Sequence, residues 1–170
     1  MGERAPDPAR LGLVVMMEQK RDKKSDNNMR RLARLAAVQG LYQIALSPEP
    51  AESLIRRFRN DPGVLLQEEG ARVAVDDDMF SQIVVGVCEF QVDLDTMIAG
   101  ATDAKLSPQR MEPLLKAILR AGTFELLHRA DIPAGVIVND YIDVAHGFFD
   151  AKEPGLVNAI LDRLSKTVRS

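Results

Sequence analysis

The 170-residue sequence is 46% hydrophobic and 28% charged, and its 22 Lys and Arg against 25 Asp and Glu give a net charge of −3. This balance is typical of one globular domain and excludes collagen-like, mucin-like and wholly disordered chains. The single cysteine, Cys88, excludes an intrachain disulfide and a multi-cysteine zinc site and fits a reducing cytoplasm. No stretch approaches about 18 consecutive apolar residues, so no transmembrane helix is expected.

The N-terminal segment differs from the rest of the chain in composition. Residues 1–28 combine prolines and glycines with a charged run, and this mixture predicts a flexible charged arm ahead of a folded domain at 29–170. Residues 17–34 hold seven cations and three acids, whereas the whole chain is acidic. This asymmetry indicates either a contact with a polyanion or a solvated charged tail.

Helical periodicity begins at Met29. Apolar residues at helical spacing predict a helix over 29–46, which Asn27 or Asn28 can cap and Ser47-Pro48 ends. A second, shorter helix is predicted over 50–60. Residues 64–75 are interpreted as a connection with a turn of helix.

The second half of the chain is also helical in pattern. The run Asp76-Asp77-Asp78 is interpreted as the start of a helix, because acidic side chains favour the positive end of a helix dipole. Residues 93–101 are predicted to form either another helix or the same one after a bend. Further helices are predicted from Ser107-Pro108 to Arg129, after Asp131-Ile132-Pro133 as far as Phe148, and from Glu153-Pro154 to 168. Alternation with period two never persists. The sequence therefore predicts an all-α fold, a single-domain bundle of about seven helices.

Signatures of catalysis are missing from the sequence. It has no glycine-rich phosphate loop, no Gly-x-Ser-x-Gly elbow and no His-Glu-x-x-His motif. His128 and His146 stand apart from the cysteine, and Cys88 is expected to be an inert buried thiol. We therefore expect no enzyme activity, no metal site and no cofactor.

The basic start of the helix predicted over 29–46 is the strongest positive feature. Arg30 and Arg34 share one face, with Arg31 beside them, and arginine suits phosphate because its planar fork donates two hydrogen bonds. Gln39 and Tyr42 follow further along, and a tyrosine ring can stack an unpaired base. The alternative is that Tyr42 belongs to the core and that the arginines only solvate a helix start.

Four segments resemble the NusB family of bacterial transcription antitermination factors. They are RRLARLAAVQGLY at 30–42, LKAILRAGTFELL at 115–127, VNDYIDVAHGF at 138–148 with the preceding Asp131-Ile132-Pro133, and GLVNAILD at 155–162. The segments occur in the family's order and span about residues 29–168. One departure is Gly122, which stands inside a predicted helix where the family has alanine. A glycine there lowers helix stability by about 0.5–1 kcal/mol relative to alanine, unless close packing requires it.

The resemblance implies a non-catalytic protein that binds the boxA element of nascent ribosomal transcripts. The partners that it implies are NusE, other Nus factors and RNA polymerase. NusE is a small-subunit ribosomal protein, and the polymerase in this complex resists termination. The resemblance also implies a cytoplasmic location. By position, the RNA-binding residues would be Arg30, Arg31, Arg34, Gln39, Tyr42, Phe148, Lys152 and Asn158. The competing hypothesis is a protein-only helical scaffold, either monomeric or homodimeric, that binds no specific RNA.

Overall fold

The computed structural model describes residues 7–66, 74–103, 105–150 and 152–169. These residues form eight α-helices and one 3₁₀ turn, which confirms the all-α fold class and adds one helix to the expected number. The elements are α1 (Pro8–Leu46), α2 (Ala51–Asn60), α3 (Gly63–Leu66), α4 (Asp77–Glu89), α5 (Gln91–Ala101), η1 (Pro108–Arg110), α6 (Pro113–His128), α7 (Ala134–Phe148) and α8 (Lys152–Val168).

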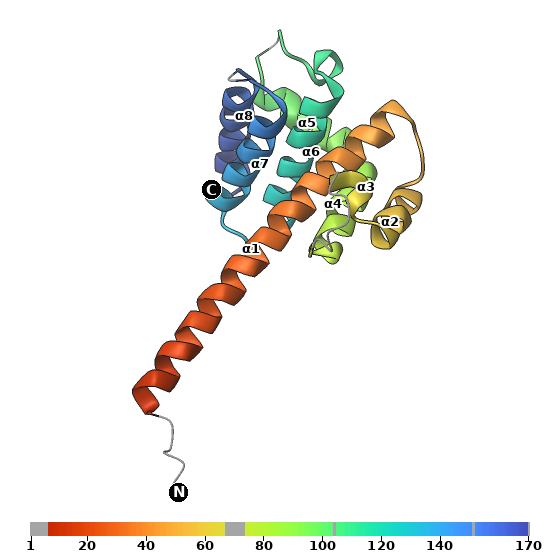
Figure 1. The fold of residues 1–170 in the computed structure, drawn as a ribbon. Helices are drawn as coiled ribbons and strands as arrows, with labels where there is room; N and C mark the ends of the chain where they lie inside the picture. The colour runs from red at the N-terminus through yellow and green to blue at the C-terminus, as the bar shows by residue number, and fades with distance from the viewer. Residues whose placement is uncertain (1–6, 67–73, 104, 151, 170) are drawn as a thin grey trace, which may run out of the picture.

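The long helix α1 organises the bundle. It crosses the molecule with α7 and α8 on one side and α2, α3 and α4 on the other, and its N-terminal half extends beyond the other helices (Figure 1). Its 39 residues span about 58 Å at the usual rise per residue. Only the part from Met29 onward buries side chains, because every side chain described between residues 7 and 28 is exposed.

Helix α6 lies at the centre of the bundle. It contacts α1, α4, α5, α7 and α8, and ten of its sixteen residues are buried. The end of α6 is closed by Arg169, whose guanidinium donates to the carbonyls of Leu126, Arg129 and Ile132. The bond to Leu126 satisfies a carbonyl group in the last turn of α6, where helix carbonyls lack partners within the helix.

The acidic run in the sequence correctly identifies the start of α4. The Asp76 carboxylate accepts a hydrogen bond from the Met79 amide at 3.0 Å and caps α4, as the acidic run predicts. Pro113 occupies the first turn of α6, where a missing amide costs nothing.

Helix α2 packs on α4 through the stacked rings of Phe58 and Phe80, whose centroids lie 3.9 Å apart.

Three local predictions were wrong. Helix α1 begins at Pro8, capped by Asp7, and not near Met29. The Ser107-Pro108 pair starts only the 3₁₀ turn η1, because the chain resumes an extended course at Met111 before α6 begins. Cys88 is exposed on α4 and is not a buried thiol. The connection predicted over 64–75 includes α3, but its residues 67–73 lie outside the described part of the chain.

Three buried glycines, Gly40, Gly86 and Gly122, stand where helices approach closely, and the last two lie against α6. A Cβ atom on Gly122 would lie 2.8 Å from Leu161 Cδ1 and 3.3 Å from the Tyr141 ring, so α6 needs a glycine where it meets α7 and α8. A Cβ atom on Gly86 would lie 2.1 Å from the Phe124 ring, where α4 meets α6. In both places close packing outweighs the low helix propensity of glycine.

None of the helices among the described residues is both long and apolar enough to cross a bilayer.

Replacing Gly86 with alanine should destabilise the bundle, because the new methyl group displaces the Phe124 ring. We expect the free energy of unfolding to fall by about 1–3 kcal/mol in urea denaturation followed by circular dichroism. Gly155→Ala is the matched control on α8, where a Cβ atom meets nothing within 4 Å and stability should stay equal or rise by up to about 1 kcal/mol. Equal midpoints for both variants would contradict this account of Gly86.

Candidate nucleic-acid interface

A groove between α1 and α7 brings together residues from opposite ends of the chain. It has a volume of about 390 Å³, and we call it the α1–α7 groove. Its lining comprises Asn28, Arg31, Leu32, Leu35 and Gln39 from α1 with Asp140, Asp143, Val144, Gly147 and Phe148 from α7. Of the eight residues expected to bind RNA, it gathers three: Arg31, Gln39 and Phe148.

Arg31 is the cation of this groove. Its side chain is 54% exposed, and its Nη2 donates to Asp143 Oδ2 at 2.9 Å. Its Nε also lies 3.9 Å from Asp140 Oδ1. Both carboxylates come from α7, so an ion pair in contact with solvent holds the guanidinium across the groove. An exposed pair of this kind contributes little to stability, and a competing anion can replace Asp143.

Arg34 lies inside the bundle, and its position contradicts the expectation that it contacts RNA. The residue is 1% exposed. Its Nε and Nη2 donate to the two carboxylate oxygens of Glu125 at 2.8 and 2.9 Å, and its Nη1 donates to Asp140 at 2.6 Å. Tyr141 donates its hydroxyl to Glu125 from the other side. This buried network joins α1, α6 and α7.

Two opposing effects set the pKa values in the network: burial disfavours the charged form of each group, and the neighbouring opposite charges favour it. Burial alone lowers the pKa of Arg34, but its hydrogen bonds to Glu125 and the nearby carboxylates raise the pKa above its ordinary value. Burial raises the pKa of Asp140, and the charges of Arg34 and Arg31 oppose that rise. Burial also raises the pKa of Tyr141 well above 10, so its hydroxyl stays protonated and donates.

The other candidate residues lie outside the groove lining. Arg30 is half-buried and lines a smaller hollow with Arg31, Arg34 and Asp140, facing the start of α7. Tyr42 is half-buried on α1, less than one turn beyond Gln39. Lys152 and Asn158 are exposed on α8 and are not among the residues that line the groove.

The sequence interpretation missed Glu125 in the buried network and Asn28, Asp140 and Asp143 in the groove. Glu125 stands inside the apolar run Phe124 to Leu127, and a charged residue inside a buried helix needs a partner. That signal points to a buried ion pair, although it does not name Arg34, which lies 91 residues away. Asp143 follows Asp140 by three residues, so both carboxylates share one face of α7.

The groove has the chemistry to bind single-stranded RNA. The Phe148 ring, 37% exposed, offers a surface on which a base can stack, and the amides of Gln39 and Asn28 can hydrogen-bond base edges. Arg31 supplies a forked donor for phosphate. Within the described residues, no cluster of three or more His, Cys, Asp or Glu side chains could hold a metal ion.

Replacing Arg34 with methionine should leave the Glu125 carboxylate buried with only the Tyr141 hydroxyl as a partner. We expect the free energy of unfolding to fall by about 3–5 kcal/mol in urea denaturation. Arg31→Met is the matched control, because it removes an exposed pair and should cost less than about 1 kcal/mol. If the two variants unfold at the same urea concentration, the buried network does not stabilise the fold as argued.

The comparisons with known proteins agree with this architecture. The sequence profile of the NusB family matches residues 31–166. The transcription antitermination protein NusB of Rhizobium etli is 45% identical over 145 residues, covering 84% of this chain and 89% of the relative. NusB of Maricaulis maris is 40% identical over 141 residues, covering 83% and 88%.

Solved structures show the same fold. NusB from T. maritima is 27% identical with a TM-score of 0.65, covering 81% of this chain and 90% of that one. A chain from a crystal structure of antitermination factors NusB and NusE with double-stranded RNA superposes with a TM-score of 0.66 at 21% identity, covering 81% and 96%. With the family profile spanning most of the chain and relatives at 40–45% identity, this protein belongs to the NusB family of transcription antitermination proteins.

Proposed function

We propose that this chain is a non-catalytic RNA-binding antitermination factor. It binds the boxA element of nascent ribosomal transcripts together with NusE in the cytoplasm and helps RNA polymerase resist termination. The observation that carries the proposal is the α1–α7 groove, where an arginine, two amides and an exposed aromatic ring meet. Membership of the NusB family supports the same function.

Within this proposal, Arg31 is the main phosphate contact and Arg30 an accessory one, whereas Arg34 positions the helix from inside. Gln39 and Phe148 contact bases, and Tyr42 borders them on α1. Lys152 and Asn158 remain proposed contacts for RNA that extends over the start of α8. The burial of Arg34 is the reason for removing it from the contact set.

The proposed partners follow from charge and from a related structure. A solved relative in the NusB fold is bound to NusE and RNA. The chain outside residues 17–34 is acidic, which suits a basic ribosomal protein such as NusE. Other Nus factors and the polymerase would join through this pair. The protein-only scaffold, either monomeric or homodimeric, is the competing function.

Changing Arg31 to alanine should weaken boxA binding without unfolding the protein. Fluorescence anisotropy of labelled boxA RNA, with a scrambled RNA as control, measures this with and without NusE at several salt concentrations. Loss of one phosphate contact should reduce the log–log salt slope by up to about 0.7, and the double change of Arg30 and Arg31 by up to about 1.4. Circular dichroism should show the fold intact in both variants.

The proposal fails if wild-type protein binds boxA and scrambled RNA equally, or binds neither, even with NusE present. Light scattering then separates the scaffold hypothesis, which expects a mass that rises with concentration. A variant with Gln39→Ala and Phe148→Ala provides a second control, because it should reduce the preference for boxA while leaving the salt slope unchanged.

Asp143→Asn should tighten RNA binding. The wild-type carboxylate pairs with Arg31 at 2.9 Å and also repels phosphate, so its neutralisation frees the guanidinium and removes a like charge from the groove. We expect an affinity gain of a few-fold that shrinks at high salt. Asp162→Asn, which breaks the exposed pair with Lys166 on α8, is the matched control and should change affinity little. Equal gains in both variants would mean that only net charge matters.

A further inference from the structure

The outer half of α1 forms a second feature beyond the groove. Residues 8–28 extend away from the bundle as about 30 Å of exposed helix (Figure 1). The match to the family begins only at residue 31, so this segment lies outside the part of the chain that the family profile covers. Any role that it has is specific to chains with such an extension.

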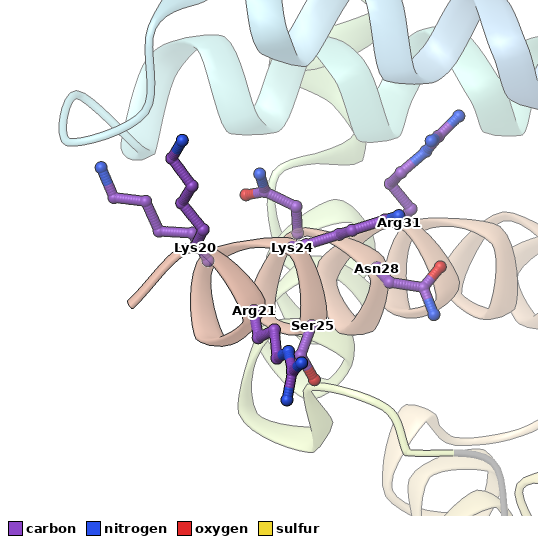
Figure 2. Close-up of a pocket in the computed structure, with 8 residues that line it drawn as sticks. Lys20, Arg21, Lys24, Ser25, Asn28 and Arg31 are labelled. Atoms are coloured by element: carbon purple, nitrogen blue, oxygen red, sulfur yellow. The ribbon is translucent and has the colours of Figure 1, made fainter. Parts of the chain in front are cut away.

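The charges on this outer helix are sorted by face. Lys20, Lys24 and Asn28 follow one another at i, i+4 and i+8, and Arg31 continues their line one turn later. The acids are Glu18, Asp22 and Asp26. They also lie at i, i+4 and i+8, but two positions out of step, and two residues correspond to about 200° around a helix. Lys20 and Lys24 therefore lie on one face and the acids on the opposite face. Arg21 lies about 100° around the helix from Lys20, at the edge of the basic face, and points away from Lys20 in Figure 2.

The basic face is continuous with the α1–α7 groove. Lys20, Arg21, Lys23 and Lys24 line one shallow hollow along α1, which Asn28 and Arg31 also line. In Figure 2 the labelled side chains of Lys20, Lys24 and Arg31 follow one another along the helix. Asn28 and Arg31 line the groove as well. The two surfaces therefore share their boundary residues.

We propose that Lys20, Arg21, Lys23 and Lys24 form a basic stripe that binds the sugar–phosphate backbone of RNA where the strand leaves the groove. This inference rests on the proposed function. The stripe extends the contact by about 16 Å, the helical rise from residue 20 to residue 31. It carries charges without an aromatic ring beside them, so the stripe contacts phosphates and reads no sequence. The uninterrupted helix fixes the stripe relative to the groove before RNA arrives.

RNA is a better occupant of the stripe than an acidic protein. The stripe lies end to end with the groove proposed for RNA, so one strand can follow both. Lysine suits phosphate as a compact point charge. The opposite acidic face would also repel a highly charged anion there, which confines the strand to one side of the helix.

The test compares RNAs of different length on two proteins. One RNA carries boxA alone, and two others extend it by about ten unstructured nucleotides at the 5′ or the 3′ end. The stripe variant changes Lys20, Arg21, Lys23 and Lys24 to glutamine. The control variant changes four exposed cations on other elements, Arg56, Lys105, Arg110 and Lys166, to glutamine and loses the same charge. Circular dichroism checks that all proteins keep the same helix content.

In the wild-type and control proteins, we expect at least one of the longer RNAs to bind more tightly than boxA alone. Its log–log salt slope should be steeper by up to about 2.8, the value for four single-strand phosphate contacts. The stripe variant should lose this gain and the steeper slope while it still binds the short boxA RNA.

Two results would overturn the inference. In the first, the affinity of the stripe variant depends on RNA length as strongly as that of the wild-type protein, which would favour an acidic protein as the occupant of the stripe. In the second, the control variant loses the affinity gain for the longer RNA as completely as the stripe variant does. Loss of boxA preference in the short RNA with wild-type protein would instead overturn the proposed function.

Discussion

The buried ion pair between Arg34 and Glu125 fixes how α1 sits in the bundle. The guanidinium is 1% exposed, and both carboxylate oxygens accept from it at 2.8–2.9 Å, so α1 has one acceptable rotation about its axis. A rotation that removed Arg34 from Glu125 would separate two buried opposite charges, which costs several kcal/mol. With α1 held in this way, Arg31 and Gln39 face α7 and form one wall of the groove.

Asp140 links this internal constraint to the surface. It accepts from the buried Arg34 at 2.6 Å and also lies 3.9 Å from the exposed Arg31. One carboxylate thus neutralises the buried Arg34 and also borders the exposed Arg31. Three arginines that look equivalent in the sequence therefore have different roles: Arg34 stabilises the fold, Arg31 faces the groove and Arg30 faces the start of α7.

Local patterns in the sequence predicted most of the fold. The periodicity of apolar residues and the proline and aspartate signals gave the all-α class and the approximate bounds of α2, α4, α7 and α8. They failed where distant contacts or charge patterns decide the outcome. The helical start at Pro8 was missed because a charged, apolar-poor segment was interpreted as an arm, although its charges repeat at i and i+4. Cys88 was placed on the wrong face of its helix.

The candidate site was predicted less completely than the fold. Arg31, Gln39 and Phe148 do line one groove. Arg34 was assigned to the surface because its partner, Glu125, lies 91 residues away and local spacing cannot identify a pair at that distance. Gly122 was recognised as unusual, and its reason, the approach of Leu161 and Tyr141, depends on the packing of three helices.

The exposed pair between Arg31 and Asp143 has a consequence for how salt acts on this surface. Added ions screen the attraction between Arg31 and phosphate, but they equally weaken the carboxylate that competes for the same guanidinium. The two effects have opposite signs. The number of phosphate contacts calculated from the salt dependence of RNA binding should therefore be lower than the number of cations that touch the strand. The size of this difference measures how strongly Asp143 competes with phosphate for Arg31.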